Sequence, residues 1–482
     1  WLTLENWSKI YGPIWTLWIG RRPQIIVADP LIAAELMARR GSKYSSRPRS
    51  IVFGEIFSQG SSIGMKPYGH SLIWLKWSVC RKLLHNSLKT SMLPVYKPRQ
   101  EAEAMIFLAG VFANTEFWSK AIDRFAASVV FSLAYGRRID NLDSKVLQTR
   151  KRLFAIASSC LAPGAYLVES LPFLLHLPDC LSKWKEYPRR TGQEAAEFDI
   201  SLVDSVQKEL REKAREVPVS LTKNMLAHQE KGEARIETLS ERHFAALPAT
   251  LYGAGFDTTA ATIHSAILAL LVHPRVQRAA RAEIDAVVGR ERTPTFEDQA
   301  KLPYIDALIK ETMRWRPAAV FGLPHTLSED DVYDGYRFAR GTTFWATAWA
   351  INQNAEYFPS PETFAPERYL EPSDPRYDAQ IAVKPFPGPW GHGTFGWGRR
   401  VCVGADLAVN NIWIVLAKLV WAFEITPIEG TAYDVDDYVG SSVLKPAPFS
   451  CHLVVRGEQT GEIIGRELKG VEKVLETFPA FD

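Results

Sequence analysis

One glycine-rich segment with a single cysteine constrains this chain more than any other feature. The segment runs Phe395-Gly-Trp-Gly-Arg-Arg-Val-Cys-Val-Gly404, a pattern of Phe-x-x-Gly-x-Arg-x-Cys-x-Gly. The thiolate form of cysteine is the one that binds metal, and Gly398 and Gly404 would let the backbone turn and approach a partner closely. A helix that starts after Cys402 would direct its positive end toward the sulfur and favour the thiolate. A cysteine in a glycine-rich loop is nevertheless more often a buried structural thiol, so the segment needs further support.

The fixed positions of this segment resemble a known signature. All five match the cysteine-loop signature of the cytochrome P450 family. The resemblance implies a heme b cofactor (iron protoporphyrin IX) with Cys402 as its axial iron ligand. It also implies that Arg400 pairs with a heme propionate, that Phe395 packs over the sulfur, and that Gly398 and Gly404 belong to the cofactor-binding loop.

A helical segment in the middle of the chain carries a second motif, Tyr252-Gly-Ala-Gly-Phe-Asp-Thr-Thr259. Helical spacing places a stripe of small residues on one face, namely Ala254, Thr258, Ala261, Thr262 and Ser265. Such a stripe fits either tight helix packing or the close approach of a flat group such as a porphyrin. The motif is similar to the oxygen-activating motif of the P450 family. This similarity implies that Asp257 and Thr258 are catalytic and guide protons, and that Ala254 and Gly255 contact the heme.

Three charged residues are expected to have a structural role. Glu311 and Arg314 lie three residues apart and share one helix face, a pattern that by itself is usually a solvated pair. The P450 family combines such a Glu-x-x-Arg with an arginine in a later Pro-Glu-Arg segment, and this chain has Pro366-Glu-Arg-Tyr369. The resemblance implies that Glu311, Arg314 and Arg368 form an ion network that helps to fold the heme pocket.

Three further heme contacts follow from the resemblance. Trp77-Ser-Val-Cys-Arg81 is similar to a helical Trp-x-x-x-Arg motif whose members contact heme propionates, and its spacing puts Trp77 and Arg81 on one face. Relatives usually carry Tyr-Gly only a few residues before this tryptophan, whereas Tyr68-Gly69 lies further away here. His325 stands where relatives often have a propionate-binding Arg or His, although an isolated histidine is more often an ordinary polar residue.

The cysteine count and the net charge exclude several other classes of protein. Five scattered cysteines without a Cys-x-x-Cys pair argue against a disulfide framework or a structural zinc site, and they favour reduced thiols in a cytosol-facing protein. A metal site that uses both His392 and Cys402 is conceivable, but no second cysteine–histidine pair supports it. A net charge of +3 without a lysine and arginine block does not indicate nucleic-acid binding.

Hydrophobic periodicity predicts a mainly α fold with minor β. The resemblance implies a single P450-type domain with a long central helix over the heme. The expected helices are at 30–40, 74–88, 99–220 (mostly), 240–273, 275–289, 302–315 and 403–422. The expected irregular and β segments are a hairpin between 13 and 28 with its turn at 20–22, loops at 50–73 and 359–389, and short strands at 332–347 and 423–455. Pro248 should delay the start of its helix or kink it. The domain is expected to cover 1–456, with a polar peripheral tail at 457–482.

The membrane signals point to attachment and not to a spanning helix. The most apolar segment, 407–425, is interrupted by Asn410 and Lys418 and predicts a buried helix. The chain begins abruptly at Trp1, so we expect an N-terminal leader with a membrane anchor to be missing from the sequence. The leucine- and proline-rich loop at 161–188 is either a cover over the core or a membrane-contact surface. The expected location is the cytosolic face of the endoplasmic reticulum membrane.

The resemblance extends from about Tyr11 to Val455 and implies a monooxygenase, most like fungal microsomal members of secondary metabolism. Such an enzyme inserts one oxygen atom of O2 into a hydrophobic small molecule, by hydroxylation or epoxidation. Its electrons come from NADPH through NADPH-cytochrome P450 reductase, with cytochrome b5 as a further candidate partner. Basic residues near the cysteine would dock an acidic reductase, namely Lys76, Arg81, Lys82 and Arg399.

Two alternative functions and the substrate remain open at this stage. A heme-thiolate isomerase or peroxygenase would need no reductase, but the intact Asp257-Thr258 pair argues against it. A heme-binding protein without catalysis is disfavoured because every core motif is present. Mostly apolar segments are expected to contact the substrate, namely 50–70, 155–185, 250–258, 318–324 and 440–444. They favour a terpenoid, polyketide or fatty chain without choosing among them.

Overall fold

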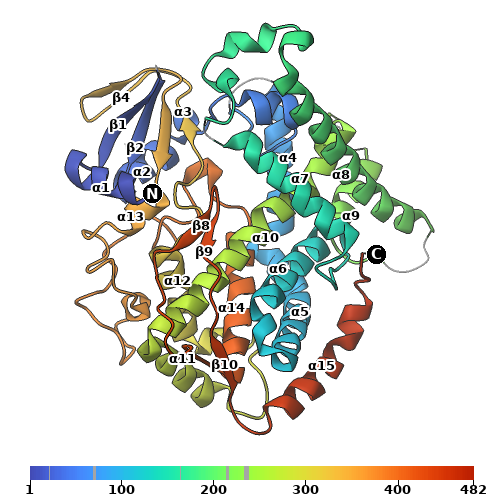
Figure 1. The fold of residues 1–482 in the computed structure, drawn as a ribbon, viewed down its shortest axis with the longest axis vertical. Helices are drawn as coiled ribbons and strands as arrows, with labels where there is room; N and C mark the ends of the chain where they lie inside the picture. The colour runs from blue at the N-terminus through green and yellow to red at the C-terminus, as the bar shows by residue number, and fades with distance from the viewer. Residues whose placement is uncertain (21, 69–71, 163, 213–216, 233–237, 482) are drawn as a thin grey trace.

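A large helical body and a smaller β-rich part lie side by side (Figure 1). The computed structural model describes residues 1–482 with the exception of residues 21, 69–71, 163, 213–216, 233–237 and 482 and of the side chains of residues 72–76. The body consists of α4 (Leu72–Leu88), α5 (Leu93–Ala113), α6 (Trp118–Tyr135), α7 (Lys145–Leu161), α8 (Glu186–Glu212), α9 (Leu221–Glu230), α10 (Glu241–Val272), α11 (Pro274–Val287), α12 (Pro303–Trp315), α14 (Ala405–Ala422) and α15 (Thr460–Glu476). The other α-helices of the described residues are short: α1 (Leu2–Tyr11), α2 (Pro30–Ala33), α3 (Gly41–Tyr44) and α13 (Ala348–Asn352). The mainly helical fold class is confirmed.

The main sheet joins the N-terminal hairpin to strands from the second half of the chain. Its order is β1-β2-β6-β3, formed by β1 (Ile14–Ile19), β2 (Arg22–Val27), β6 (Thr343–Ala346) and β3 (His325–Thr326). The hairpin pairs antiparallel from Ile14 opposite Val27 to Ile19 opposite Arg22, as expected, and β2 runs parallel to β6. Residue 21 of the predicted turn lies outside the described residues. Three two-stranded pairs complete the β structure: β4 (Asp331–Tyr333) with β5 (Tyr336–Phe338), β8 (Tyr438–Gly440) with β9 (Leu444–Pro446), and β7 (Phe423–Thr426) with β10 (His452–Val455).

Helix α10 crosses the centre of the molecule as one continuous element of 32 residues (Figure 1). Ser240 caps its N-terminus by accepting a hydrogen bond from the backbone N–H of His243. Pro248 lies inside the helix, so the expected late start is wrong. A proline costs a helix one hydrogen bond and some strain, but Leu247 and Pro248 are both buried among α10's neighbours, and this packing keeps the helix intact.

Helices α10 and α14 are each long and apolar enough to span a membrane. Of the apolar window in each, 78% and 83% respectively is buried inside the protein. Both are therefore core helices of the fold. The burial of α14 agrees with the expectation of a buried helix for the segment around 407–425. Their burial positions the motifs they carry at the centre of the fold.

The segment at 50–73 is not simply a loop. Residues Ile51–Phe57 form a π-helix with five buried apolar side chains, and α4 already begins at Leu72. The glycine and serine residues of the segment gave the expectation of a loop, but the apolar stretch at its start packs against α7 and α8. A short irregular helix can form here because tertiary contacts, not local propensity, stabilise it.

The C-terminal residues are also integrated into the body. Instead of a peripheral tail, they form α15, which packs against α5 and buries Ile463 and Ile464. Beyond the helix, the backbone N–H of Phe481 donates to the carbonyl of Arg138 at 3.0 Å. The many charged residues of the tail hid a periodic apolar face, which is why composition alone indicated a surface extension.

Candidate active site

The cysteine segment forms a closed turn that ends at the start of α14. The backbone N–H of Cys402 donates to the carbonyl of Phe395 at 2.9 Å. Gly398 has a φ of +55°, and an added Cβ would collide with the carbonyl oxygen of Met37, so glycine is required there. Gly404 caps α14 with an ordinary φ of −97°, and an added Cβ would meet no atom within 4 Å. Neither the backbone conformation nor the packing of the described residues therefore requires a glycine at position 404, contrary to the expectation from sequence.

Cys402 lies deep in the fold yet keeps an accessible surface. Burial raises the pKa of its thiol, while the backbone N–H of Gly404 and the charge of Arg81 act in the opposite direction. A side chain can be desolvated and still have accessible surface when it lines an internal space, as Cys402 does. The α14 helix begins at Ala405, so its positive end lies beside the sulfur as the sequence indicates.

The middle of α10 also has an accessible face. Ala254 is exposed and Thr258 is half-buried, although most of the helix is buried. The Thr258 hydroxyl donates to the Ala254 carbonyl at 2.6 Å. The rest of the predicted stripe is buried, namely Ala261, Thr262 and Ser265. Gly255 points elsewhere, since an added Cβ would lie 3.1 Å from Val130 of α6, so the structure does not bring Gly255 to the accessible face.

Asp257 is partly buried next to Thr258. Burial raises the pKa of its carboxyl, the charges of Lys445 and Lys151 partly offset that rise, and Asp123 adds to it. A carboxyl group with a raised pKa keeps its proton more readily near neutral pH than an exposed aspartate does. The pair is therefore suited to carry protons.

Three arginines around the cysteine loop have no carboxylate partner among the described residues. Among the described residues, their guanidinium groups donate to backbone carbonyls: Arg47 to Gly64, Leu323 and Pro324, Arg81 to Val401, and Arg400 to Ser45 and Lys66. No carboxylate of the described chain contributes to the charge environment of any of them. Burial and mutual repulsion lower the pKa of Arg47 to about 9 and that of Arg400 to about 10. Arg47 is buried, and Arg81 and Arg400 are half-buried. Such a group of desolvated cations is costly unless an anion binds to it.

Both residues of the predicted helical motif reach this cluster. The guanidinium of Arg400 lies over the Trp77 ring, 4.6 Å from its centroid, and Arg81 donates to the carbonyl of Val401 at 2.5 Å. The ring of Tyr68 meets Trp77 edge-on at 5.8 Å. The unusual spacing between Tyr68 and Trp77 therefore does not prevent α4 from presenting Trp77 and Arg81 to the cysteine loop.

His325 is buried beside the same arginines and is neutral. Its Nδ1 donates to the carbonyl of Tyr44 at 2.7 Å. Burial lowers its pKa to about 3, and Arg47 and Arg400 add to this effect. The Nε2 atom of the neutral ring is an acceptor. His325 can therefore donate from Nε2 to a propionate only if the bound anion raises the pKa of the ring enough to protonate it.

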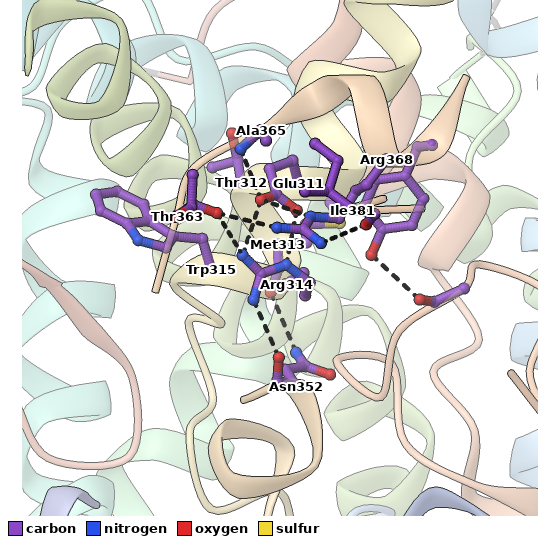
Figure 2. Close-up of polar contacts among 12 residues, drawn as sticks. Glu311, Thr312, Met313, Arg314, Trp315, Asn352, Thr363, Ala365, Arg368 and Ile381 are labelled. Carbon is purple, nitrogen blue, oxygen red and sulfur yellow. Dashed lines mark hydrogen bonds and ion pairs between the residues drawn. The ribbon is translucent and has the colours of Figure 1, made fainter. Parts of the chain in front are cut away.

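The expected ion network is present and buried (Figure 2). Arg314 Nε and Nη2 donate to the two carboxylate oxygens of Glu311 at 2.6 and 2.8 Å, and Arg368 Nε donates at 3.1 Å. Burial by itself lowers the pKa of Arg314, but Glu311 more than compensates and raises it. Arg314 also donates to the carbonyl of Asn352, whose Oδ1 accepts from the backbone of Gly393 at 2.8 Å. The network thus connects α12 to the chain just before the cysteine segment, while its role in folding the pocket stays a prediction.

These features together fit a flat, doubly anionic cofactor such as heme. The fit rests on an accessible cysteine, an accessible small-residue patch on α10, and a cluster of cations that lacks a carboxylate, namely Cys402, Ala254, Thr258, Arg47, Arg81 and Arg400. The described part of the chain contains no group of three or more His, Cys, Asp or Glu residues that could hold a metal ion. A metal site at His392 and Cys402 thus gains no support.

Comparison with known proteins decides the family. A family model described as cytochrome P450 matches residues 1–452. The chain belongs to the cytochrome P450 family. This P450 is 34% identical to a cytochrome P450 monooxygenase of Armillaria gallica, over 97% of this chain and 88% of the relative. It is 34% identical to cytochrome P450 monooxygenase 253 of Postia placenta (95% and 85%) and 32% identical to a cytochrome P450 monooxygenase of Aspergillus aculeatus (97% and 86%).

Solved structures agree on the fold. A zebra fish cytochrome P450 structure with abiraterone matches this P450 with a TM-score of 0.73 and 24% identity, over 95% of this chain and 99% of that one. The protein is a cytochrome P450 monooxygenase, as the cysteine segment indicated. The family implies a heme-thiolate cofactor, and a P450 monooxygenase generally needs a redox partner.

Sequence analysis gave no site role to Arg47, although the structure places it in the cationic cluster. The dipeptide Arg47-Pro48 carries no periodic pattern, and its meaning depends on contacts to Leu323 and Pro324, far away along the chain. Arg81, expected both to contact heme and to dock a reductase, donates to the Val401 carbonyl of the cysteine loop and is half-buried. Its role in docking stays a prediction.

Proposed function

We propose that this P450 inserts one oxygen atom of O2 into a hydrophobic organic substrate, by hydroxylation or epoxidation, using heme b and electrons that originate from NADPH. The observation that carries the proposal is the accessible Cys402 together with buried arginines that lack a carboxylate partner. A heme held by a cysteine thiolate supplies the activation of dioxygen and the transfer of one oxygen atom. The chain supplies the ligand, the charges and the protons.

The residues around Cys402 would hold the cofactor. The Gly404 N–H and the charge of Arg81 favour the thiolate, which is the form that binds metal. Arg47, Arg81 and Arg400 would pair with the propionates and lose their mutual repulsion in doing so. The open space at the Cβ position of Gly404 leaves room for a flat group beside the start of α14.

The binding of the cofactor can be tested by spectroscopy. The reduced, carbon-monoxide-bound protein should show a Soret band near ~450 nm, as expected for thiolate ligation. Cys402→Ala should lose this band, and Cys451→Ala is a suitable control because Cys451 is a buried thiol of the main core. A band near ~420 nm in folded wild-type protein would contradict the proposal.

Asp257 and Thr258 would move protons on the α10 side. The Thr258 hydroxyl is held by the Ala254 carbonyl, so it has a fixed position from which its oxygen can accept and pass on a proton. The Asp257 carboxyl, whose pKa is raised, can then supply a new proton to the Thr258 hydroxyl.

Thr258→Ala should therefore uncouple NADPH consumption from product and release peroxide. General acid contributions of this kind are commonly worth about 10²-fold or more. The measurement is the ratio of product to NADPH consumed, with Thr250→Ala as control because Thr250 lies two turns earlier and bonds the Ala246 carbonyl. Unchanged coupling in Thr258→Ala would remove this residue from proton delivery.

A hydrophobic substrate fits the apolar walls of the expected contact segments. Phe53 and Phe57 of the π-helix stack at 5.8 Å, and Tyr166 packs against the same cluster. Val320 and Phe321 provide a second apolar surface before β3. These residues support a terpenoid, polyketide or fatty-chain substrate of secondary metabolism, to be tested by spectral titration with one compound of each class; tighter binding of a charged sugar would contradict it.

Electrons would come from NADPH-cytochrome P450 reductase or cytochrome b5. Lys82 and Arg399 are exposed and support docking of an acidic partner, whereas the side chain of Lys76 lies outside the described residues. Surface charge pairs weaken with salt. The rate of reduction by the reductase should fall with ionic strength and in Lys82→Glu, and a salt-independent rate would argue against this surface.

We also propose attachment to the endoplasmic reticulum membrane, with the domain on the cytosolic face. Large apolar side chains are exposed on the 161–188 segment and at the tip of the β1–β2 hairpin: Leu167 73%, Phe173 65%, Leu181 70% and Trp18 64%. Exposed apolar groups of this size favour contact with lipid. Phosphatidylcholine vesicles should retain the wild-type protein better than a Leu167→Ser, Phe173→Ser variant; equal retention would contradict the membrane contact.

A further inference from the structure

A cleft of about 240 Å³ lies on the side of α4 that faces away from the cysteine loop. Three residues of α4 line it, namely Leu83, Asn86 and Ser87. Their spacing of three and four positions puts them on one helix face. With 3.6 residues per turn, that face is opposite the one that carries Trp77 and Arg81. Helix α4 therefore separates the cleft from the proposed heme site.

The other wall of the cleft comes from α9, which packs against α4. Its lining residues are again spaced by three and four positions: Asn224, Ala227, His228 and Lys231. One face of α9 therefore lines the cleft. The Thr222 hydroxyl fixes α9 to α6, because it donates to the Ala134 carbonyl at 2.8 Å. The cleft is thus formed by two helices that are both held by the body of the protein.

The chemistry of the lining is divided between an apolar floor and a polar rim. Leu83 and Met225 are buried members of the main core, and Met92 packs against it. Methionine side chains adapt to ligands of varied shape. Asn86 and Lys231 are exposed and therefore lie at the rim. Among the described residues, no aspartate or glutamate lines the cleft. An apolar floor below a cation and amide groups suits an organic anion.

The volume of the cleft limits the size of the ligand. About 240 Å³ equals the space of about eight water molecules at about 30 Å³ each. Pockets for drug-sized ligands are larger, at about 300–1,000 Å³. A short-chain or single-ring acid therefore fits this cleft, whereas a sterol does not.

We propose that the cleft between α4 and α9 is a binding site for a small organic acid. The carboxylate contacts the ammonium group of Lys231 and the side-chain amide of Asn224, and the apolar part of the acid covers Leu83 and Met225. The site is distinct from the heme site, because α4 lies between the two. The inference stands independently of the proposed monooxygenase reaction.

The test uses 4-(trifluoromethyl)benzoate as the probe and the heme-loaded protein as the receptor. Broadening of the fluorine NMR signal of the probe reports binding. Saturating 4-phenylimidazole is present throughout to occupy the iron side, so that broadening reports a different site. The neutral analogue 4-(trifluoromethyl)benzamide shows whether the negative charge matters.

Four variants locate the binding site. Ala227→Trp and Asn86→Trp fill the cleft from its two walls, and both positions are exposed, so the substitutions spare the core. Lys231→Glu reverses the charge at the rim. Lys469→Glu makes the same charge change at an exposed position of α15 and is the matched control. The circular dichroism and carbon-monoxide spectra check the fold of each variant, and either tryptophan variant that keeps the wild-type spectra decides the test.

The benzoate should be broadened by the wild type far more than the benzamide, and the tryptophan variants should abolish the broadening. Lys231→Glu should weaken binding by about 3- to 10-fold, because an exposed ion pair contributes modestly and charge reversal adds repulsion. Lys469→Glu should match the wild type. Added salt should weaken binding to the wild type, since it screens an exposed charge pair.

Three results would overturn the proposal. No broadening by the wild type would show that the cleft does not take this acid. Equal broadening by the wild type and by a folded tryptophan variant would place the binding elsewhere. Equal broadening of the benzoate and the benzamide would exclude an acid as the preferred ligand. Failure of the proposed function would appear separately, as a missing thiolate band in the wild type.

Discussion

Two groups of buried or half-buried arginines in this P450 differ in how their charge is balanced. Arg314 and Arg368 share the carboxylate of Glu311, which also accepts from the backbone of Ala365 at 2.9 Å (Figure 2). The second group, Arg47, Arg81 and Arg400, has backbone carbonyls as partners and no carboxylate among the described residues. The described residues supply a carboxylate counter-charge to the first group and none to the second.

The pKa of an arginine shifts in opposite directions in the two groups. In the first group Glu311 outweighs burial and raises the pKa of Arg314. In the second, burial and neighbouring cations lower the pKa of Arg47 to about 9. A buried charge with its partner is a structural unit, whereas buried like charges without a partner oppose folding until an anion arrives. The first group therefore stabilises the fold, and we propose that the second marks a cofactor site.

The largest expected effect comes from breaking the first group. Glu311→Gln leaves two buried guanidinium groups without their counter-charge, which should lower the free energy of unfolding by about 3–5 kcal/mol. Urea denaturation and the yield of soluble protein measure the loss. The exposed Glu356 provides the control variant Glu356→Gln, which should behave as wild type. A Glu311→Gln protein of normal stability would show that the two groups do not differ in kind.

Removing a cation from the second group should instead affect the cofactor. Arg400→Met keeps an unbranched side chain over Trp77 but removes one charge-assisted pair to a propionate, worth about 1.5–3 kcal/mol. Heme loss to excess apomyoglobin should accelerate by about 10- to 100-fold, while the circular dichroism spectrum stays that of the wild type. Destabilisation as large as that of Glu311→Gln, with unchanged heme loss, would reverse the assignment of the two groups.

The smallest expected effect is a dependence of stability on pH. The pKa of Arg47 in the folded, heme-free protein is lowered to about 9 from 12.5, so above about pH 9 the unfolded chain binds more protons than the folded one. The contribution of Arg47 to stability should then rise with pH, since its penalty is complete below that range and is relieved above it.

The measurement compares unfolding of the wild type and of Arg47→Met between pH 7 and 10. The heme-free wild type should gain stability relative to the variant as pH rises past about 9. In the heme-loaded protein this trend should disappear, because the propionates return the pKa toward its ordinary value. The same trend with and without heme would indicate that no anion binds near Arg47.

Local patterns predicted much of the fold and part of the site. The cysteine loop, the motif around Thr258 and the Glu311–Arg314 pair each lie within a few residues along the chain, so their geometry follows from one turn or one helix face. The hairpin was predicted for the same reason. The functional roles of these residues remain predictions, to be settled by the experiments above.

Expectations that needed distant contacts were wrong or missing. The Ile51–Phe57 π-helix and the packing of α15 against α5 depend on surfaces supplied by other helices. The orientation of Gly255 toward α6 likewise follows from the packing of two helices. Such contacts have no signature within a short window of sequence.

By itself the sequence determined the family, the cysteine segment that we propose as ligand, and the class of reaction, because those depend on residue identities at fixed short spacings. The tertiary structure alone decided which arginines meet without a carboxylate, and which helix faces enclose the cleft between α4 and α9. The physical reason is that the energy of a buried charge depends on what surrounds it in space, and neighbours such as Arg47 and Arg400 are separated by most of the chain.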